Sequence, residues 1–158
     1  MSVPPYTVTV LQGSAGIAHK GMAAVLAMRQ QVFVAEQGIP AAADADGLDS
    51  TCWHVLVAVQ QQPAASGRLY PVGGKAGHGV LSRIAVLPPW RGQGLSAVVL
   101  HHLEQVALQQ GLATLSLHAH DFLELFYRKR GFAPIPGHDT QVGQYRLVKM
   151  AKNLKPAP

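Results

Sequence analysis

The sequence is poor in cysteine and in charge. Its 158 residues include a single cysteine, Cys52, and only 13% of them are charged. One cysteine excludes an intrachain disulfide and a four-thiolate metal site, which favours a reducing compartment such as the cytoplasm. The low charge fraction, together with 48% hydrophobic residues, excludes a disordered chain and indicates a packed domain. A lone cysteine in such a chain is typical of a buried side chain rather than of a nucleophile.

Long hydrophobic runs and long basic runs are missing as well. No apolar stretch is long enough to span a bilayer, and the N-terminus lacks the pattern of an export signal, so we expect no membrane partner. The net charge of +5 would suit an anionic ligand, but the longest basic run is only residues 128–130. Base-stacking aromatics do not alternate with these scattered charges, so we expect no nucleic-acid partner.

Hydrophobic periodicity predicts a mixed α/β chain. The predicted helices cover residues 18–33, 94–110 and 122–129, and the predicted strands cover residues 6–11, 53–59, 67–72, 79–87, 113–118 and 144–150. The three successive strands between residues 53 and 87 predict an antiparallel meander. The length fits one domain, which we place at residues 1–150. Residues 151–158 contain two prolines and are predicted to be a frayed C-terminal tail.

A short glycine-bearing segment precedes the longest predicted helix. At such a position, unpaired backbone N–H groups and the helix dipole can hold phosphate oxygens. Gly92 and Gly94 let the backbone approach a ligand, Arg91 adds a charge and Ser96 adds a hydroxyl donor. An ordinary helix-opening turn is the simplest alternative. A dinucleotide-binding fingerprint also fits formally, but the next strand ends in residues 118–120, His-Ala-His, where that fingerprint requires an acid.

Three motifs in order resemble the GCN5-related N-acetyltransferase (GNAT) superfamily. Residues 91–96, Arg-Gly-Gln-Gly-Leu-Ser, resemble its pyrophosphate signature Q/R-x-x-G-x-G/A, with Ser96 in place of the final small residue. Residues 80–86 with Pro88 resemble the central strand, and residues 126–132 resemble the final Tyr-x-x-x-Gly-Phe element. Residues 32–40, followed by Asp46 and Asp49, resemble the N-terminal part of the ElaA-like branch.

The resemblance implies a fold and an activity. The fold would be a single α/β domain with a mixed, mostly antiparallel central sheet flanked by helices. The activity would be N-acetyl transfer from the cosubstrate acetyl-CoA to an amine of a small molecule or peptide, by direct attack and without a metal. The implied acetyl-CoA-binding residues are Ile84, Ala85, Val86, Arg91, Gly92, Gln93, Gly94, Leu95, Ser96, Phe122, Tyr127 and Lys129. A homodimer is compatible with the family.

The resemblance also implies catalytic roles. Tyr127 takes the position of the general acid, because a phenol with a pKa near ~10 holds its proton at neutral pH. Glu36 is the leading general base, since apolar neighbours would raise its pKa. The alternatives are a half-buried structural tyrosine and a solvated glutamate, and other candidate bases are His54, His118 and His120. An H-x-H pattern without further ligands is more typical of two polar strand residues than of a metal site.

The predicted acceptor-binding residues lie between residues 29 and 54, with His120 as the one exception. They are Arg29, Glu36, Asp46, Asp49, His54 and His120. Arg29 could instead pair with one of the acids, and Asp46 and Asp49 could instead be turn residues. Two other functions stay open: an acyltransferase like the acyl-homoserine-lactone synthases, and a non-catalytic acyl-CoA-binding module. The first is disfavoured because those enzymes house a long acyl chain and usually extend further at the C-terminus.

Overall fold

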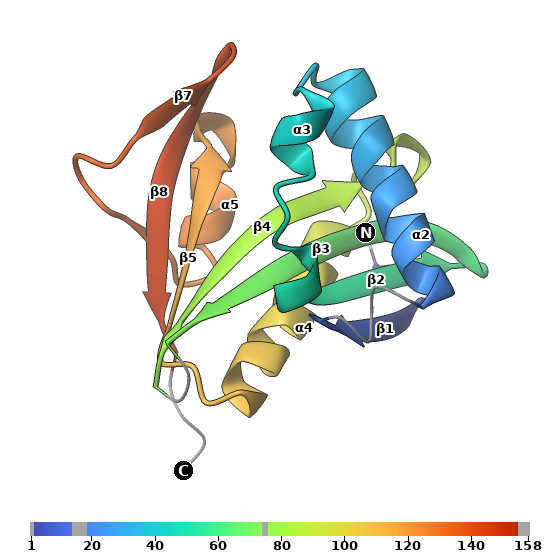
Figure 1. Ribbon diagram of the computed structural model, residues 1–158, viewed down its shortest axis with the longest axis horizontal. Helices are drawn as coiled ribbons and strands as arrows, with labels where there is room; N and C mark the ends of the chain where they lie inside the picture. Colours follow the sequence, from blue (N-terminus) through green and yellow to red (C-terminus); the bar gives the residue numbers. More distant parts are fainter. Residues whose placement is uncertain (1, 14–18, 74–75, 155–158) are drawn as a thin grey trace.

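An eight-stranded sheet with helices on both faces forms the frame of the protein in the computed structural model, which describes residues 2–13, 19–73 and 76–154 (Figure 1). The order of the strands is β1-β2-β3-β4-β5-β8-β6, and β7 pairs with β8. The β4–β5 pair is parallel, and the other described pairs are antiparallel. The strands are β1 (Thr7–Gln12), β2 (Trp53–Val59), β3 (Gln62–Val72), β4 (His78–Val86), β5 (Thr114–His120), β6 (Ala133–Pro134), β7 (Thr140–Val142) and β8 (Tyr145–Asn153). The predicted mixed, mostly antiparallel sheet is therefore confirmed.

Helices cover both faces of the sheet. In Figure 1, α2 and α3 lie in front of the strands and α4 lies behind them. The helical segments are α2 (Lys20–Arg29), the π-helix η1 (Gln30–Glu36), α3 (Ala41–Asp44), η2 (Asp49–Thr51), η3 (Pro88–Trp90), α4 (Leu95–Gln109), η4 (Asp121–Leu123) and α5 (Glu124–Arg128). The apolar stripe of α4 is buried against β2, β3 and β4, as its helical spacing predicts. The core therefore lies mainly between α4 and the sheet.

Strands β4 and β5 pair over only three residues. The pairing joins His78–Val80 to Thr114–Ser116 and goes no further among the described residues. Past that point the two strands diverge, as Figure 1 shows. A bulge also lies in β4, because its register with β3 shifts between Ser66 and Arg68, opposite Arg83, whose φ is 58°. The second half of β4 therefore presents a free edge toward β5.

Several predicted boundaries are wrong, and two of them change how the fold is read. The predicted turn over residues 60–66 is only Gln60 and Gln61, with φ values of 53° and 64°, and Gln62 already begins β3. A two-residue turn with both φ values positive closes a hairpin. Such a turn usually contains asparagine or glycine, so two glutamines do not predict it. Strand β8 runs on to Asn153, and Leu154 is buried. Residues 151–154 are thus part of the fold rather than a frayed tail, while residues 155–158, like Ala18 at the predicted start of the first helix, lie outside the described residues.

Candidate active site

The glycine segment forms an open cradle at the start of α4. Gly92 and Gly94 have φ values of 75° and 83°, a region that other residues rarely adopt. Gly94 is the N-cap of α4, and no side chain caps this helix. The first amide of the helix to bond within it is that of Val98, to the carbonyl of Gly94. The amides of Leu95 and Ser96 therefore point out of the helix end without a helical partner, which suits an anion.

Arg91 links this cradle to Glu36 at the end of η1. Its Nε donates to the carbonyl oxygen of Val86 at 2.9 Å, and its two terminal nitrogens each lie 2.8 Å from a carboxylate oxygen of Glu36. This ion pair is exposed to solvent on both sides. The hydrogen bond from Arg91 lowers the pKa of Glu36. The expectation that apolar neighbours raise this pKa is wrong, and an exposed, paired carboxylate with a lowered pKa is a poor general base.

The free edge of β4 leads straight into the cradle. On one side Ala85 and Val86 pair with β3, and on the other side β5 has already turned away. Ala85 is buried, whereas Ile84 and Val86 are half-buried. On the β5 side no described strand pairs with residues 84–86, and the carbonyl oxygen of Val86 accepts the hydrogen bond from Arg91. An extended chain of amides and a thioester could lie against this edge as an added strand does.

Tyr127 lies on α5, behind β5. Its ring is 7% exposed and makes edge-on contacts with Phe126 at 5.0 Å and Phe132 at 5.8 Å. Burial raises the pKa of Tyr127 to about 12, and the nearby Arg130 opposes this shift. The phenol therefore keeps its proton at neutral pH. Among the described residues its hydroxyl has no hydrogen-bond partner, although the oxygen is not itself sealed from solvent.

Of the three basic residues that end α5, two are engaged locally. Arg128 bonds to Glu124 at 2.7 Å, and Arg130 donates to the carbonyl of Phe126 and lies over its ring. Lys129 is exposed and makes no ion pair with any residue that the structure describes. Of the three, Lys129 is thus the one without a local partner among the described residues, and its contact with a phosphate of acetyl-CoA stays a prediction.

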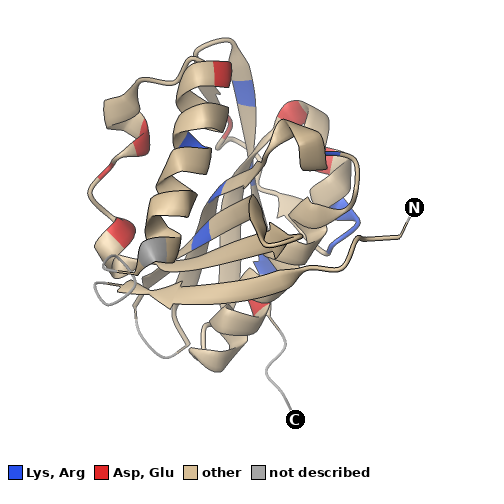
Figure 2. Ribbon diagram, turned by 90° about the vertical axis from the view of Figure 1, so that its right-hand side faces the viewer, with Lys and Arg blue, Asp and Glu red and all other residues tan. Residues whose placement is uncertain are grey.

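The acidic segment, residues 44–49, lies along α2 (Figure 2), and the buried Arg29 and Arg68 bind its carboxylates. Arg29 on α2 is only 1% exposed. Its Nε lies 3.2 Å from both carboxylate oxygens of Asp44, and its Nη1 lies 2.8 Å from Asp49. The alternative that Arg29 pairs with an acid is therefore confirmed. Because the guanidinium is sealed and its bonds are used, the prediction that Arg29 binds the acceptor is wrong.

Two arginines of the sheet complete this network. Arg68 on β3 reaches Asp46 at 2.7 Å and Asp49 at 3.0 Å, and Arg83 on β4 reaches Asp44 at 2.9 Å and Asp46 at 3.3 Å. The hydrogen bond from Arg68 holds the pKa of Asp46 well below its usual range. Asp46 also accepts the amide of Leu48, the turn bond predicted as an alternative. Three arginines thus neutralise three carboxylates, which leaves Asp46 and Asp49 little charge with which to attract a cationic amine.

His54 and Cys52 are buried next to this network. His54 is 0% exposed, and its Nε2 lies 3.0 Å from the carbonyl oxygen of Asp49. Burial lowers the pKa of His54, so the ring is neutral. The predicted contact between His54 and a substrate is wrong, because no substrate can reach the ring. Cys52 is also 0% exposed, and burial raises its pKa to about 11, which confirms an inert buried cysteine.

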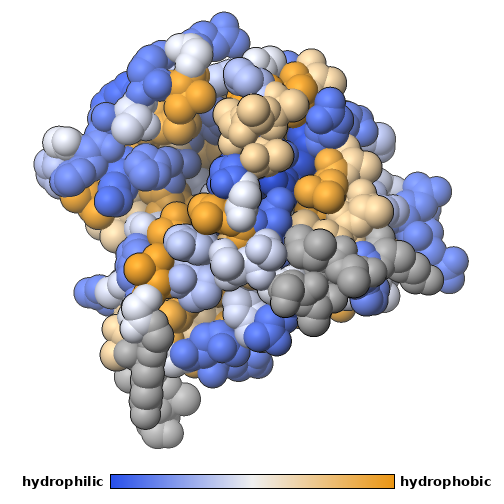
Figure 3. All heavy atoms as spheres, in the orientation of Figure 1, coloured by the Kyte–Doolittle hydropathy of each residue, from blue (hydrophilic) through white to orange (hydrophobic). Residues whose placement is uncertain are grey.

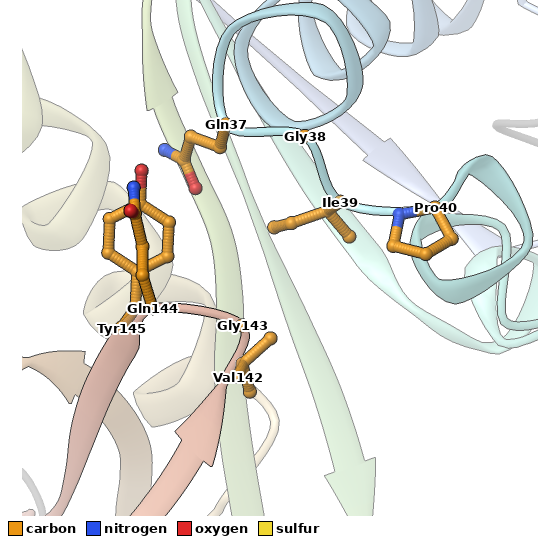
Figure 4. A pocket seen from close by; sticks show the side chains of 8 residues that line it. All are labelled: Gln37, Gly38, Ile39, Pro40, Val142, Gly143, Gln144 and Tyr145. Atoms are coloured by element: carbon orange, nitrogen blue, oxygen red, sulfur yellow. The ribbon is translucent and has the colours of Figure 1, made fainter.

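A cavity of about 270 Å³ opens between the end of η1 and the β7–β8 hairpin (Figure 4). Figure 4 shows Gln37 pointing toward Tyr145 and Ile39 pointing toward the hairpin. The lining carries no charged side chain; it consists of Gln37, Gly38, Ile39, Pro40, Val142, Gly143, Gln144 and Tyr145. Sequence reasoning missed Gln37 and Tyr145. Gln37 lies in the segment that resembles the ElaA-like branch, whereas nothing in the sequence singles out Tyr145.

His120 and Phe122 join the cavity to β5. The His120 ring stacks on Phe122, with centroids 5.2 Å apart, and meets Tyr145 edge-on at 4.8 Å. Phe122 itself is 70% exposed. On the face drawn in Figure 3, hydrophilic residues gather in the middle between hydrophobic patches. The structure therefore brings His120 to the edge of the cavity, on the side where β5 has left β4.

An anion cradle at a helix start beside a diverging strand pair suits a CoA-dependent acyltransferase, and the comparisons with known proteins agree. The family model described as "Acetyltransferase (GNAT) domain" matches residues 31–154. The N-acetyltransferase YjcF of Bacillus subtilis, described as uncharacterized, is 33% identical over 66% of this chain and 73% of its own length. The chain belongs to the GNAT acetyltransferase family.

Solved structures show the same fold. The crystal structure of Escherichia coli ElaA aligns with a TM-score of 0.81 and 24% identity, over 94% of this chain and 99% of that one. An acyl-CoA N-acyltransferase from Pseudomonas aeruginosa aligns with the same TM-score, identity and coverage. The predicted resemblance to the ElaA-like branch is confirmed at the level of the fold.

Two further observations concern metals and membranes. Within residues 2–13, 19–73 and 76–154, no three His, Cys, Asp or Glu side chains come together in a way that could hold a metal ion. None of the helices in that part of the chain combines the length and hydrophobicity needed to cross a bilayer.

Proposed function

We propose that the protein transfers the acetyl group of acetyl-CoA to the amine of a small molecule or peptide, by direct attack of the amine on the thioester. The observation that carries this proposal is the uncapped start of α4 beside the free edge of β4. Oriented amides at a helix N-terminus bind phosphate without a further charge. The diphosphate of acetyl-CoA would lie on residues 92–96, and its pantetheine arm along residues 84–86.

The positions of the side chains fit the chemistry of this transfer. As the nitrogen–carbon bond forms, the carbon–sulfur bond breaks and negative charge moves to the departing sulfur. Tyr127 would donate its phenol proton to that thiolate, and its hydroxyl is free to do so. The acceptor starts as an ammonium ion and loses one proton before its nitrogen attacks. After the attack the nitrogen loses a second proton, which restores the phenol. The products are an amide, CoA thiol and one proton.

The cavity between η1 and the β7–β8 hairpin would hold the acceptor. Its uncharged lining of amide, aromatic and aliphatic groups suits a neutral body next to the amine. Phe122 and Lys129 lie exposed on the same side as α5 and would contact the cofactor. Lys129 offers its charge to a phosphate because its two basic neighbours already have partners.

Release of CoA thiol in the presence of an amine panel tests this proposal. The panel would hold polyamines, amino acids, amino sugars, and peptides with free N-termini. We expect at least one amine to give thiol release above the hydrolysis rate, together with an acetylated product seen by mass spectrometry. Longer acyl-CoAs in the same assay would set the acyl-chain preference. Binding of acetyl-CoA without turnover of any amine would contradict the proposed acetyltransferase activity and favour a non-catalytic acyl-CoA-binding module.

A further inference from the structure

His120 lies beside the cavity proposed for the acceptor, in contact with Tyr145 of its lining. It is the last residue of β5, four positions past Ser116, where the pairing with β4 ends. Its ring is fixed between Phe122 and Tyr145, and Tyr145 also lines the cavity. The side chain thus stands between the diverging strands and the cavity proposed for the acceptor.

One nitrogen of this ring has no partner. Nδ1 of His120 is buried, and no residue that the structure describes forms a hydrogen bond with it. A buried nitrogen without a partner is unfavourable, so such atoms call for a functional explanation. Gln37, which lines the cavity, likewise has a buried amide oxygen without a hydrogen-bond partner among the described residues. Two buried polar atoms without partners, one in the lining of the cavity and one beside it, suit a ligand that brings N–H groups.

We propose that His120 is the general base that takes the proton from the acceptor amine. This inference rests on the proposed acetyl transfer and names the residue that makes the amine reactive. An ammonium group gives one proton to Nδ1 of His120, and the neutral amine then attacks the thioester carbon. His120 passes that proton to solvent, which is the one proton released by the overall reaction.

The surroundings keep the ring able to accept a proton. Burial lowers the pKa of His120, and the neighbouring carboxylate of Asp121 opposes this shift. Tyr145 faces the ring from β8, and His118 precedes it on the same face of β5, where Lys149 of β8 is its cross-strand neighbour. The ring is therefore neutral at pH 7 and competent as a base.

The other candidate bases are occupied or inaccessible. Glu36 is paired with Arg91, and His54 is sealed in the core. The carboxylates of the acidic segment are bonded to arginines. His118 lies two residues closer to the point where β5 still pairs with β4, and so further from the cavity. Of the two β5 histidines, His120 is the one that contacts the wall of the cavity, through Tyr145, and that has a buried ring nitrogen without a partner among the described residues.

The pH dependence of kcat/KM tests the assignment with the amine found in the panel. We expect His120→Gln to lower kcat by about 100-fold or more and to abolish the loss of rate on the acidic side. His102→Gln is the matched control, because His102 also has its pKa lowered by burial but lies on α4. The control should keep the wild-type profile. A His120→Gln enzyme with wild-type rate and an unchanged acidic limb would overturn the proposal.

A titration of the imidazole signals by NMR in the unaltered protein tests the same proposal without turnover. We expect the pKa of His120 to lie below the ordinary value of about 6.5. A value above 7 would overturn the assignment even if His120→Gln fails to fold. Failure of the wild-type protein to bind acetyl-CoA would instead remove the acetyltransferase proposal. Normal turnover by His120→Gln would remove only the role of His120.

Discussion

The two sides of the candidate cleft are built in different ways. The proposed cofactor side, residues 84–96, is a local structure in which two glycines and a helix start orient the backbone amides. The acceptor side, residues 36–49, is held in place by side chains from α2, β3 and β4 through buried ion pairs. A local structure can be recognised from consecutive residues, whereas the ionic network joins positions up to 39 residues apart. The proposed cofactor side can therefore be predicted from a sequence motif, whereas the acceptor side depends on tertiary packing.

Loss of Arg29 should have the largest effect. Arg29→Met leaves Asp44 and Asp49 without their most deeply buried partner, so the free energy of unfolding should fall by about 3–5 kcal/mol. Arg128→Met removes an exposed ion pair on α5 and should cost at most about 0.5 kcal/mol. Urea unfolding of both variants measures the difference. Equal stabilities would show that the network contributes nothing to the acceptor side.

Loss of the Tyr127 hydroxyl should have the second largest effect. Tyr127→Phe keeps the ring contacts with Phe126 and Phe132 but removes the proton donor, so kcat should fall by about 100-fold. Calorimetry should show unchanged binding of acetyl-CoA, because the cradle on α4 is untouched. The thiol-release assay measures the rate. A variant with wild-type kcat would return Tyr127 to a purely structural role.

Acid should weaken the acceptor side through Asp46. Arg68 lowers the pKa of this carboxyl in the folded protein, so its stabilising effect is complete above the unfolded value and is lost as the pH falls toward the folded value. The free energy of unfolding should therefore decline below about pH 4. Asp46→Asn should flatten part of that decline when both proteins are unfolded by urea across the range. Parallel curves for the two proteins would count against the network.

Glu36 should matter least. Glu36→Gln releases Arg91 from an exposed ion pair of at most about 1 kcal/mol, so the affinity for acetyl-CoA should increase by no more than about fivefold. We expect the pH dependence of kcat/KM not to change, because the proposed base is His120. Calorimetry and the rate profile measure the two effects. Loss of the acidic limb in this variant would restore Glu36 as the base and remove His120.

The contrast also explains what the sequence could predict. Gly92, Gly94 and Arg91 stand together in a known signature, and the order of strands and helices followed from periodicity, so the fold was predicted correctly. The short Gln60–Gln61 turn was missed because its strained residues are not glycines. The roles of Arg29 and His54 were wrong, because burial at 1% and 0% depends on which distant segments cover them. The pKa of Glu36 is lowered, although the sequence predicted that it would be raised. The cause is again a distant residue, because its partner Arg91 is 55 positions away in the sequence.

Binding of acetyl-CoA to the purified protein, followed by isothermal titration calorimetry, tests the central claim that the uncapped start of α4 holds a diphosphate. We predict saturable one-to-one binding with a Kd below about 1 mM, weakened when Gly92 is replaced by valine, which would force the backbone out of its left-handed conformation. The same titration with CoA should give a similar Kd, because both carry the diphosphate. The absence of heat at millimolar acetyl-CoA would contradict the account.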